Sequence, residues 1–123
     1  MESTRKKRLE RLLKLCKDFP EVDITGDQHL TFRVRKKIFA YYLNNHHGDG
    51  RVAICCRARA GVQADLIRKD PERNFVAAYL GPRGWAAARV DLKDVDWDAL
   101  VVLLIDAYVL SAPKKLAQQI TGK

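Results

Sequence analysis

The sequence predicts an α+β fold in which an antiparallel β-sheet carries the N- and C-terminal helices on one face, in two layers. Helical spacing of apolar residues occurs near both ends of the chain, whereas the middle is rich in β-branched and aromatic residues. Short turn signals separate most of the strand-like segments, which is typical of hairpins. The 123 residues contain no internal repeat and no linker, so we expect a single domain over residues 1–123.

The first predicted element is an amphipathic helix over residues 3–17. Ser3 or Thr4 can cap its start. Its inward-facing residues follow at helical spacing, namely Leu9, Leu12, Leu13 and Cys16. Because the residue before a proline disfavours helical backbone, we expect this helix to end at Phe19-Pro20.

Strands are predicted next, because residues 22–42 are rich in β-branched and aromatic side chains. We expect two antiparallel strands here, with a break near Arg35-Lys36-Lys37. Residues 44–50 combine Asn, His, Gly and Asp and predict a loop. A further strand is predicted over residues 51–59.

The second half of the chain returns to helix through a mixed region. Its patterns predict, in order, helix 61–69, strand 75–80, turn 81–84 and strand 85–92. Asp94 or Asp96 can cap a longer helix that runs through Leu110. Ser111 can cap a final short helix with Pro113 in its first turn.

Arginines alternate with apolar residues along two of the predicted strands. Successive strand residues point to opposite faces, so within residues 51–59 the side chains of Val52, Ile54, Cys56 and Ala58 share one face. The other face then carries Arg51, Arg57 and Arg59. Residues 30–35 repeat the pattern with Arg33 and Arg35. The predicted sheet therefore has an arginine-rich face that suits an anionic partner.

The charge balance supports an anionic partner. The formal net charge is +8, and such an excess favours nucleic acid, anionic membrane surfaces or acidic proteins. The three cysteines and the absence of a secretory signal indicate a reducing cytoplasm. The longest apolar run, residues 99–105, is interrupted by Asp106 and is too short to span a membrane. We expect a cytoplasmic monomer without membrane contact.

Several segments occur together in the order found in one protein family. They are Phe32-Arg33-Val34, Ile38-Phe39-Ala40, the arginine strand, Ala64-Asp65-Leu66-Ile67-Arg68, Gly84-Trp85, Val90-Asp91-Leu92, and Ala107-Tyr108 ahead of Lys114-Lys115-Leu116. From about residue 5 to residue 117 the chain resembles the MmcQ/YjbR family of small bacterial proteins. The resemblance implies a frataxin-like (CyaY-like) fold, and it implies DNA binding, which has been proposed for the family from its fold.

The chain departs from that family at two places. Relatives often carry Ser-Tyr in the last helix and Gly-Lys near the first hairpin, where this chain has Ala107-Tyr108 and Lys36-Lys37. The first change argues against the serine as an essential nucleophile.

The candidate nucleic-acid-binding residues are those of the arginine-rich face and its turns: Arg33, Arg35, Lys36, Lys37, Arg57, Arg59, Arg83, Trp85 and Arg89. Arginines bridge phosphates, and Trp85 can either stack on a base or pack at the edge of the sheet. Phosphate contacts carry no sequence information, so we expect little base preference. With about five phosphate contacts, the log–log salt slope of binding should be about −4 to −5.

Three other interpretations of the same surface stay open. An antiparallel sheet face is normally polar, so the arginines can simply be solvated. The same face can instead present itself to an acidic protein partner, which would make the protein an adaptor. A small-molecule pocket beside Trp85 and Tyr108 is the third alternative.

We expect no catalytic residues, metal or cofactor. P-loop, Gly-x-Gly-x-x-Gly, Gly-x-Ser-x-Gly and His-Glu-x-x-His motifs are all absent from the sequence. His46-His47 and Cys55-Cys56 lack the spacing of zinc ligands. The run that begins at Asp94 fails as a calcium loop, because Ala99 and Ile105 stand where glycine and glutamate are required. The first helix is too basic for an iron site.

Overall fold

The computed structural model describes residues 2–122 of the chain. Four α-helices and six strands follow one another in these residues, together with two short 3₁₀-helices. The elements are α1 (Glu2–Lys17), β1 (Val22–Gly26), β2 (Leu30–Val34), β3 (Lys37–Asn44), η1 (His46–Gly48), β4 (Val52–Cys56), α2 (Val62–Lys69), β5 (Asn74–Phe75), η2 (Gly81–Arg83), β6 (Ala86–Arg89), α3 (Trp97–Ser111) and α4 (Lys114–Thr121).

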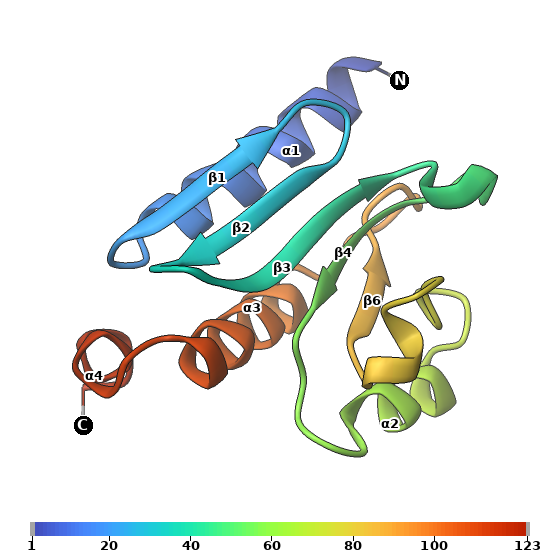
Figure 1. Ribbon diagram of the computed structural model, residues 1–123. Helices are drawn as coiled ribbons and strands as arrows, with labels where there is room; N and C mark the ends of the chain where they lie inside the picture. The colour runs from blue at the N-terminus through green and yellow to red at the C-terminus, as the bar shows by residue number, and fades with distance from the viewer. Residues whose placement is uncertain (1, 123) are drawn as a thin grey trace.

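All six strands form one open antiparallel sheet in the order β1-β2-β3-β4-β6-β5. The first four strands are neighbours both in sequence and in space, whereas β6 pairs with β4 and leaves β5 at the edge (Figure 1). This arrangement confirms the predicted α+β class and the predominance of hairpin connections.

The helices α1, α3 and α4 pack on one face of the sheet, which we call the helix face (Figure 1). The alternation of β2 places Leu30, Phe32 and Val34 on this face, and all three are buried. Phe39 of β3 lies edge-on to Tyr108 of α3, with ring centroids 5.6 Å apart. The sheet with terminal helices on one face is therefore confirmed. The helices pack there because each of them buries one apolar stripe against the sheet.

The opposite face of the sheet is closed over only part of its width. Residues 76–85 lie next to β6 on this face (Figure 1). Ala77, Leu80 and Trp85 from this segment form a second apolar cluster with Leu43 of β3, Cys55 of β4 and Ala87 of β6. As a result every residue of β4 is buried. The residues of β4 that were predicted to face inward do lie on the helix face. The residues on the other face of β4 were predicted to be exposed, but they are buried as well.

Residues 22–44 contain three strands, so the prediction of two was wrong. The additional turn lies between Gly26 and Leu30. Gly26 has φ 117°, and a Cβ there would lie 2.1 Å from the carbonyl oxygen of His29, so this turn needs glycine. The predicted break at Arg35-Lys36-Lys37 is confirmed, and Arg35 has a left-handed φ of 57°.

The segment 75–80 was wrongly predicted as a strand. Only Asn74 and Phe75 pair with β6, and the chain then turns, with Tyr79 at φ 66°. Local backbone hydrogen bonds take the place of strand pairing in this segment. For example, the Leu80 N–H donates to the Ala78 carbonyl oxygen at 2.8 Å. These turns let the segment lie flat over the sheet.

The N-terminal cap of α3 was predicted correctly, and the N-terminal cap of α4 was predicted wrongly. Asp96 caps α3 and accepts from the Ala99 N–H at 3.1 Å. Ser111 does not cap α4, because it is the last residue of α3 and Pro113 occupies the N-cap position. Within the described residues, no helix combines the length and apolar character needed to cross a membrane.

Candidate functional site

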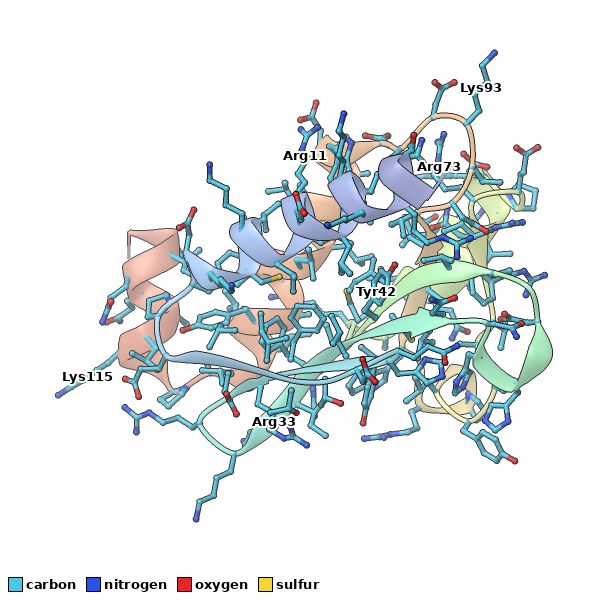
Figure 2. All side chains as sticks on the ribbon, turned by 90° about the horizontal axis from the view of Figure 1, so that it is seen from above. Arg11, Arg33, Tyr42, Arg73, Lys93 and Lys115 are labelled. Atoms are coloured by element: carbon cyan, nitrogen blue, oxygen red, sulfur yellow. The ribbon has the colours of Figure 1, made fainter. Side chains whose placement is uncertain are left out.

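Three arginines line up on the face of the sheet opposite the helices, and we call Arg33, Arg57 and Arg83 the arginine row. Arg33 on β2 pairs with Ile38 on β3. The Ile38 carbonyl accepts from Arg57 Nη2 at 3.4 Å. The guanidinium groups of Arg57 and Arg83 lie 5.5 Å and 5.1 Å from the centre of the Trp85 ring. Figure 2 shows Arg33 on the side of the sheet away from α1.

Two arginines of this row pack against Trp85. Its side chain is buried, with 3% of the residue exposed, and its ring lies 5.7 Å from that of Tyr41. Gln63 fixes the backbone around it by donating from Nε2 to the carbonyl oxygens of Trp85 and Gly81. Of the two predicted roles, packing is the one that the structure shows. The base-stacking role is wrong for this conformation, because the arginines and the sheet cover the indole ring.

No carboxylate lies within 4 Å of a cationic nitrogen of the arginine row, among the residues that the structure describes. Arg33 donates from Nη1 to Thr25 Oγ1 at 2.8 Å, which holds the side chain without neutralising it. Arg57 Nε is buried and has no partner in the described structure. Asp23 lies directly opposite Arg33 in the β1–β2 register, but it forms no ion pair with Arg33 within 4 Å. The row therefore presents three cations without a close ion pair among the described residues.

Three other predicted residues are separated from this row and are paired with acids. Arg35 lies 2.6 Å from Glu21, and the hydrogen bond and charge of Glu21 raise the pKa of Arg35. Arg59 lies 3.7 Å from Asp106 of α3, so it faces the helix side. The prediction that Arg59 shares a face with Arg57 was wrong, because β4 ends at Cys56 and strand alternation stops there.

Arg89 is also held by an acidic partner. Its Nε donates to Asp91 Oδ1 at 2.9 Å, and both side chains are mostly buried. Burial raises the pKa of Asp91, but hydrogen bonds from Arg89 and from the Val52 N–H outweigh it, so the net pKa of Asp91 is lowered. Arg89 therefore orders the loop after β6. The register places it opposite Ala53, on the predicted face of the sheet, but its charge is paired with Asp91.

Lys36 and Lys37 are exposed at the β2–β3 turn. They border a groove of about 680 Å³ whose other wall is the α3–α4 junction, including Ser111 and Pro113. Ser111 is buried, and its hydroxyl has no hydrogen-bond partner in the described structure. The two lysines therefore lie at the end of β2 and β3 that is next to the α3–α4 junction.

A second basic surface was not assigned a role from the sequence. The outward side of α1 exposes Arg5, Lys6, Lys7, Lys14 and Lys17. Two further α1 arginines are used internally: Arg8 donates to the carbonyl oxygens of Val90 and Leu92, and Arg11 lies 4.2 Å from the Trp97 ring centre. The concentration of lysine and arginine in residues 5–17 was the signal for this surface.

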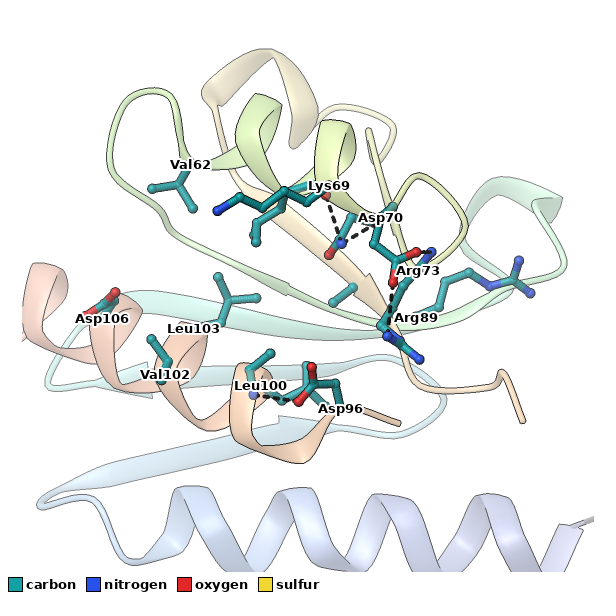
Figure 3. Close-up of a pocket in the computed structure, with 14 residues that line it drawn as sticks. Val62, Lys69, Asp70, Arg73, Arg89, Asp96, Leu100, Val102, Leu103 and Asp106 are labelled. Carbon is teal, nitrogen blue, oxygen red and sulfur yellow. Dashed lines mark hydrogen bonds and ion pairs between the residues drawn. The ribbon is translucent and has the colours of Figure 1, made fainter. Parts of the chain in front are cut away.

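A pocket of about 380 Å³ lies between α2, α3 and the β5–β6 edge of the sheet (Figure 3). Trp85 and Tyr108 do not line it. A small-molecule pocket beside those two aromatic residues was therefore wrongly placed. Tyr108 instead donates its hydroxyl to the Pro20 carbonyl at 2.5 Å in the interior of the helix face.

The cysteines form no disulfide and are all buried. Burial raises the pKa of Cys16 and of Cys55 to about 12, and it raises that of Cys56 as well. Such thiols are protonated at neutral pH and are poor nucleophiles. In the described part of the chain, no group of three or more His, Cys, Asp or Glu side chains is placed to hold a metal ion.

Comparison with known proteins assigns the chain to a family. Residues 16–110 match the YjbR family model, which is more than half of the chain. The chain belongs to the YjbR family. No curated protein matches it significantly.

Among solved structures, the chain is similar to the Deinococcus radiodurans protein DR2400, described as a DUF419 domain. The two have 19% sequence identity and a TM-score of 0.69, over 83% of this chain and 76% of the other. At this identity the likeness concerns the fold alone. The YjbR assignment and the shared architecture confirm the resemblance inferred from the sequence motifs.

Proposed function

We propose that this YjbR-family chain is a non-enzymatic nucleic-acid-binding protein, with DNA as the first partner to test. It would bind the phosphate backbone through the arginine row and show little sequence selectivity. The observation that carries the proposal is that Arg33, Arg57 and Arg83 share one face of the sheet and form no ion pair within 4 Å among the described residues.

The position of two of these cations against one aromatic ring supports an anionic ligand. Arg57 and Arg83 both lie within 5.5 Å of the centre of one indole ring. Like charges repel, and an anion that contacts both guanidinium groups would reduce the repulsion between them. Two guanidinium groups that repel each other without a ligand and are stabilised by a bound anion support a role in anion binding.

The row is also partly ordered before any ligand arrives. Contact with Trp85 and the bond to the Ile38 carbonyl restrict Arg57, and the bond to Thr25 restricts Arg33. Restricting a long side chain in advance lowers the entropy lost on binding. A planar guanidinium also presents paired donors that match phosphate oxygens.

Lys36 and Lys37 would add two more phosphate contacts at the exposed turn. Together with the arginine row this gives five contacts, and each contributes about −0.9 to the log–log salt slope on duplex DNA. We therefore expect a slope of about −4 to −5. Since Trp85 is covered, the proposed contacts are with phosphates, and base preference should be weak.

The test is fluorescence anisotropy of labelled duplex DNA, single-stranded DNA and RNA, titrated with the protein at several salt concentrations. Arg57→Glu with Arg83→Glu should weaken binding at least about tenfold and reduce the salt slope by about 2. The single change Arg33→Gln, which leaves Trp85 and its contacts intact, should weaken binding by a smaller factor. Thermal melting of each variant separates lost binding from lost folding.

The matched control is Lys14→Glu with Lys17→Glu on α1. It changes the net charge by the same amount on a different surface, so it should weaken binding only slightly. If the α1 pair weakens binding as much as the arginine pair, net charge explains the affinity and the proposed face is rejected. If the wild-type protein binds none of the three nucleic acids at low salt, the nucleic-acid function is rejected. A single acidic protein partner captured in a pull-down would then favour an adaptor role.

A further inference from the structure

Tyr79 holds an aromatic ring in solvent on the irregular segment 76–85. The residue is 74% exposed, whereas Trp85 of the same segment is 3% exposed. The backbone of Tyr79 has a left-handed φ of 66°. A bulky residue rarely adopts this conformation, and such strain persists mostly at binding and catalytic sites, where the surrounding structure enforces it. The protein therefore keeps this ring outside the core at a cost in backbone energy.

Contacts with the loop after β3 hold Tyr79 in this position. The Ala78 carbonyl oxygen accepts from the Leu80 N–H at 2.8 Å and from Nε2 of His46 at 3.2 Å. The ring of His47 lies against the ring of Tyr79, with centroids 4.8 Å apart and planes tilted by 51°. Both histidines belong to η1. The exposed ring is therefore ordered before any ligand arrives, which lowers the entropy lost on binding.

Tyr79 and one cation of the arginine row belong to the same tight turn. The Leu80 carbonyl oxygen accepts from the Arg83 N–H at 3.1 Å and from the Trp85 N–H at 3.4 Å. Arg83 is exposed and forms no ion pair within 4 Å among the described residues. Proteins that bind single-stranded nucleic acid combine these two groups, since bases stack on aromatic rings and phosphates meet cations. In a duplex the bases stack on one another, so this ring has no partner there.

We propose that Tyr79 extends the arginine row into a site for single-stranded nucleic acid, in which one unpaired base stacks on the exposed tyrosine ring. This inference rests on the proposed function, because the arginine row supplies the phosphate contacts. Tyr79 takes the stacking role that the buried Trp85 does not fill. Every base has an aromatic face, so this contact adds affinity for unpaired strands without adding sequence selectivity.

The first experiment titrates the wild-type protein with labelled probes of equal length. Oligo(dT) and oligo(U) carry unpaired bases, whereas an abasic DNA strand keeps the phosphates and lacks the bases. At least one of the two base-bearing strands should bind about tenfold more tightly than the abasic strand, the ratio that one base stacked on an aromatic ring contributes. In NMR spectra, that strand should shift the backbone amides of Tyr79 and His47, and the abasic strand should shift them much less.

Variants of Tyr79 separate stacking from charge. Tyr79→Gly removes the ring and suits the positive φ, so its melting temperature should not fall below that of wild type. Its affinity for the base-bearing strand should fall about tenfold, to that of the abasic strand. The salt slope and the affinity for duplex DNA should stay unchanged, because no cation is lost. Tyr79→Phe keeps the ring and should bind like wild type. The matched control Val102→Ala shortens an exposed apolar residue of α3 and should change none of these values.

Three results would overturn this inference and leave the proposed phosphate binding intact. These are equal wild-type affinity for base-bearing and abasic strands, wild-type affinity of Tyr79→Gly for the base-bearing strand, or a loss of affinity in Tyr79→Phe as large as in Tyr79→Gly. Absence of binding to every probe at low salt, duplex DNA included, would instead reject the proposed function and this inference with it. Because the comparison of probes uses the wild-type chain, it decides the inference even if a variant does not fold.

Discussion

The two faces of the sheet are closed in different ways. The helix face is covered by α1, α3 and α4 and contains the large aromatic side chains Phe32, Phe39 and Tyr108, none of which is exposed. The opposite face is covered only over β4 and β6, by an irregular segment that contributes Trp85. Over β1, β2 and the near part of β3 it carries polar groups such as Arg33 and Thr25.

This difference follows from residue size along β4 and β6. On the opposite face these strands present Ala53, Cys55 and Ala87. Small side chains allow a chain segment to approach the sheet closely, and Trp85 then fills the remaining space. The edge of this covered area is where Arg57 and Arg83 reach the surface. The arginine row exists because the opposite face is half closed.

The largest expected effect is a difference in the free energy of unfolding between two substitutions on β3, one on each face of the sheet. Phe39→Ala removes a ring that is fully buried on the helix face, and it should lower the free energy of unfolding by about 3–5 kcal/mol. Tyr41→Ala removes a half-buried ring that packs on Trp85, and it should cost about 1–2 kcal/mol. Urea unfolding measures both. Equal costs would show that the opposite face is packed as tightly as the helix face.

An intermediate effect should come from the adjacent thiols of β4. Burial raises the pKa of Cys55 from 9.0 to about 12, although this thiol lies on the face that simple alternation would leave open to solvent. The folded state keeps the proton while the unfolded thiol loses it above pH 9, so stability is full below pH 9 and declines as the pH rises toward 12. The decline should reach about 1 kcal/mol for this thiol by pH 10.

Two measurements check the state of Cys55. A thiol reagent at pH 7.5 should modify the native protein far more slowly than the urea-unfolded protein. Cys55→Ala should flatten the alkaline decline of stability. Rapid modification of Cys55 in the native state would mean that residues 76–85 do not seal this face.

An effect that disappears at acid pH should come from the Arg89–Asp91 pair. The pKa of Asp91 is lowered in the folded state, so its contribution is present above the ordinary value of 3.8 and is lost as the pH falls through the folded pKa. Arg89→Met leaves the mostly buried Asp91 carboxylate without its counter-charge, so it should cost about 1–3 kcal/mol at neutral pH. The difference from wild type should shrink below about pH 4.

The same variant tests the division of the arginines into two groups. Because Arg89 is engaged with Asp91, Arg89→Met should leave the affinity for DNA close to that of wild type, whereas Arg33→Gln should lower it. Acid unfolding and anisotropy titrations on the two variants provide the comparison. A loss of affinity in Arg89→Met as large as in Arg33→Gln would place Arg89 back in the binding surface.

Much of the helix face could be predicted from the sequence. Period-two alternation identified Ile54 and Cys56 as facing inward, and helical spacing identified Leu12 and Cys16; all four are buried. These patterns are local, since each depends only on the geometry of one strand or one helix. Asp96 was predictable as a cap for the same reason, because a cap involves only the next three residues.

The binding surface could be predicted only in part. Arg33, Arg57 and Arg83 do lie together, as expected from alternation and from the turn before Trp85. The partners of Arg35, Arg59 and Arg89 could not be foreseen, because Glu21 and Asp106 are distant in sequence and Asp91 lies in a loop. Which cations are neutralised depends on contacts between elements.

The sequence by itself determined the fold class, the YjbR resemblance and the apolar stripe of each main element, because periodicity and turn chemistry act within a few residues. Only the tertiary structure decided that residues 76–85 fold over β4 and bury Trp85. The pocket between α2 and α3 was likewise decided by how distant elements pack. Packing is a property of surfaces that meet in space, and a pattern along one strand or helix does not specify its neighbour.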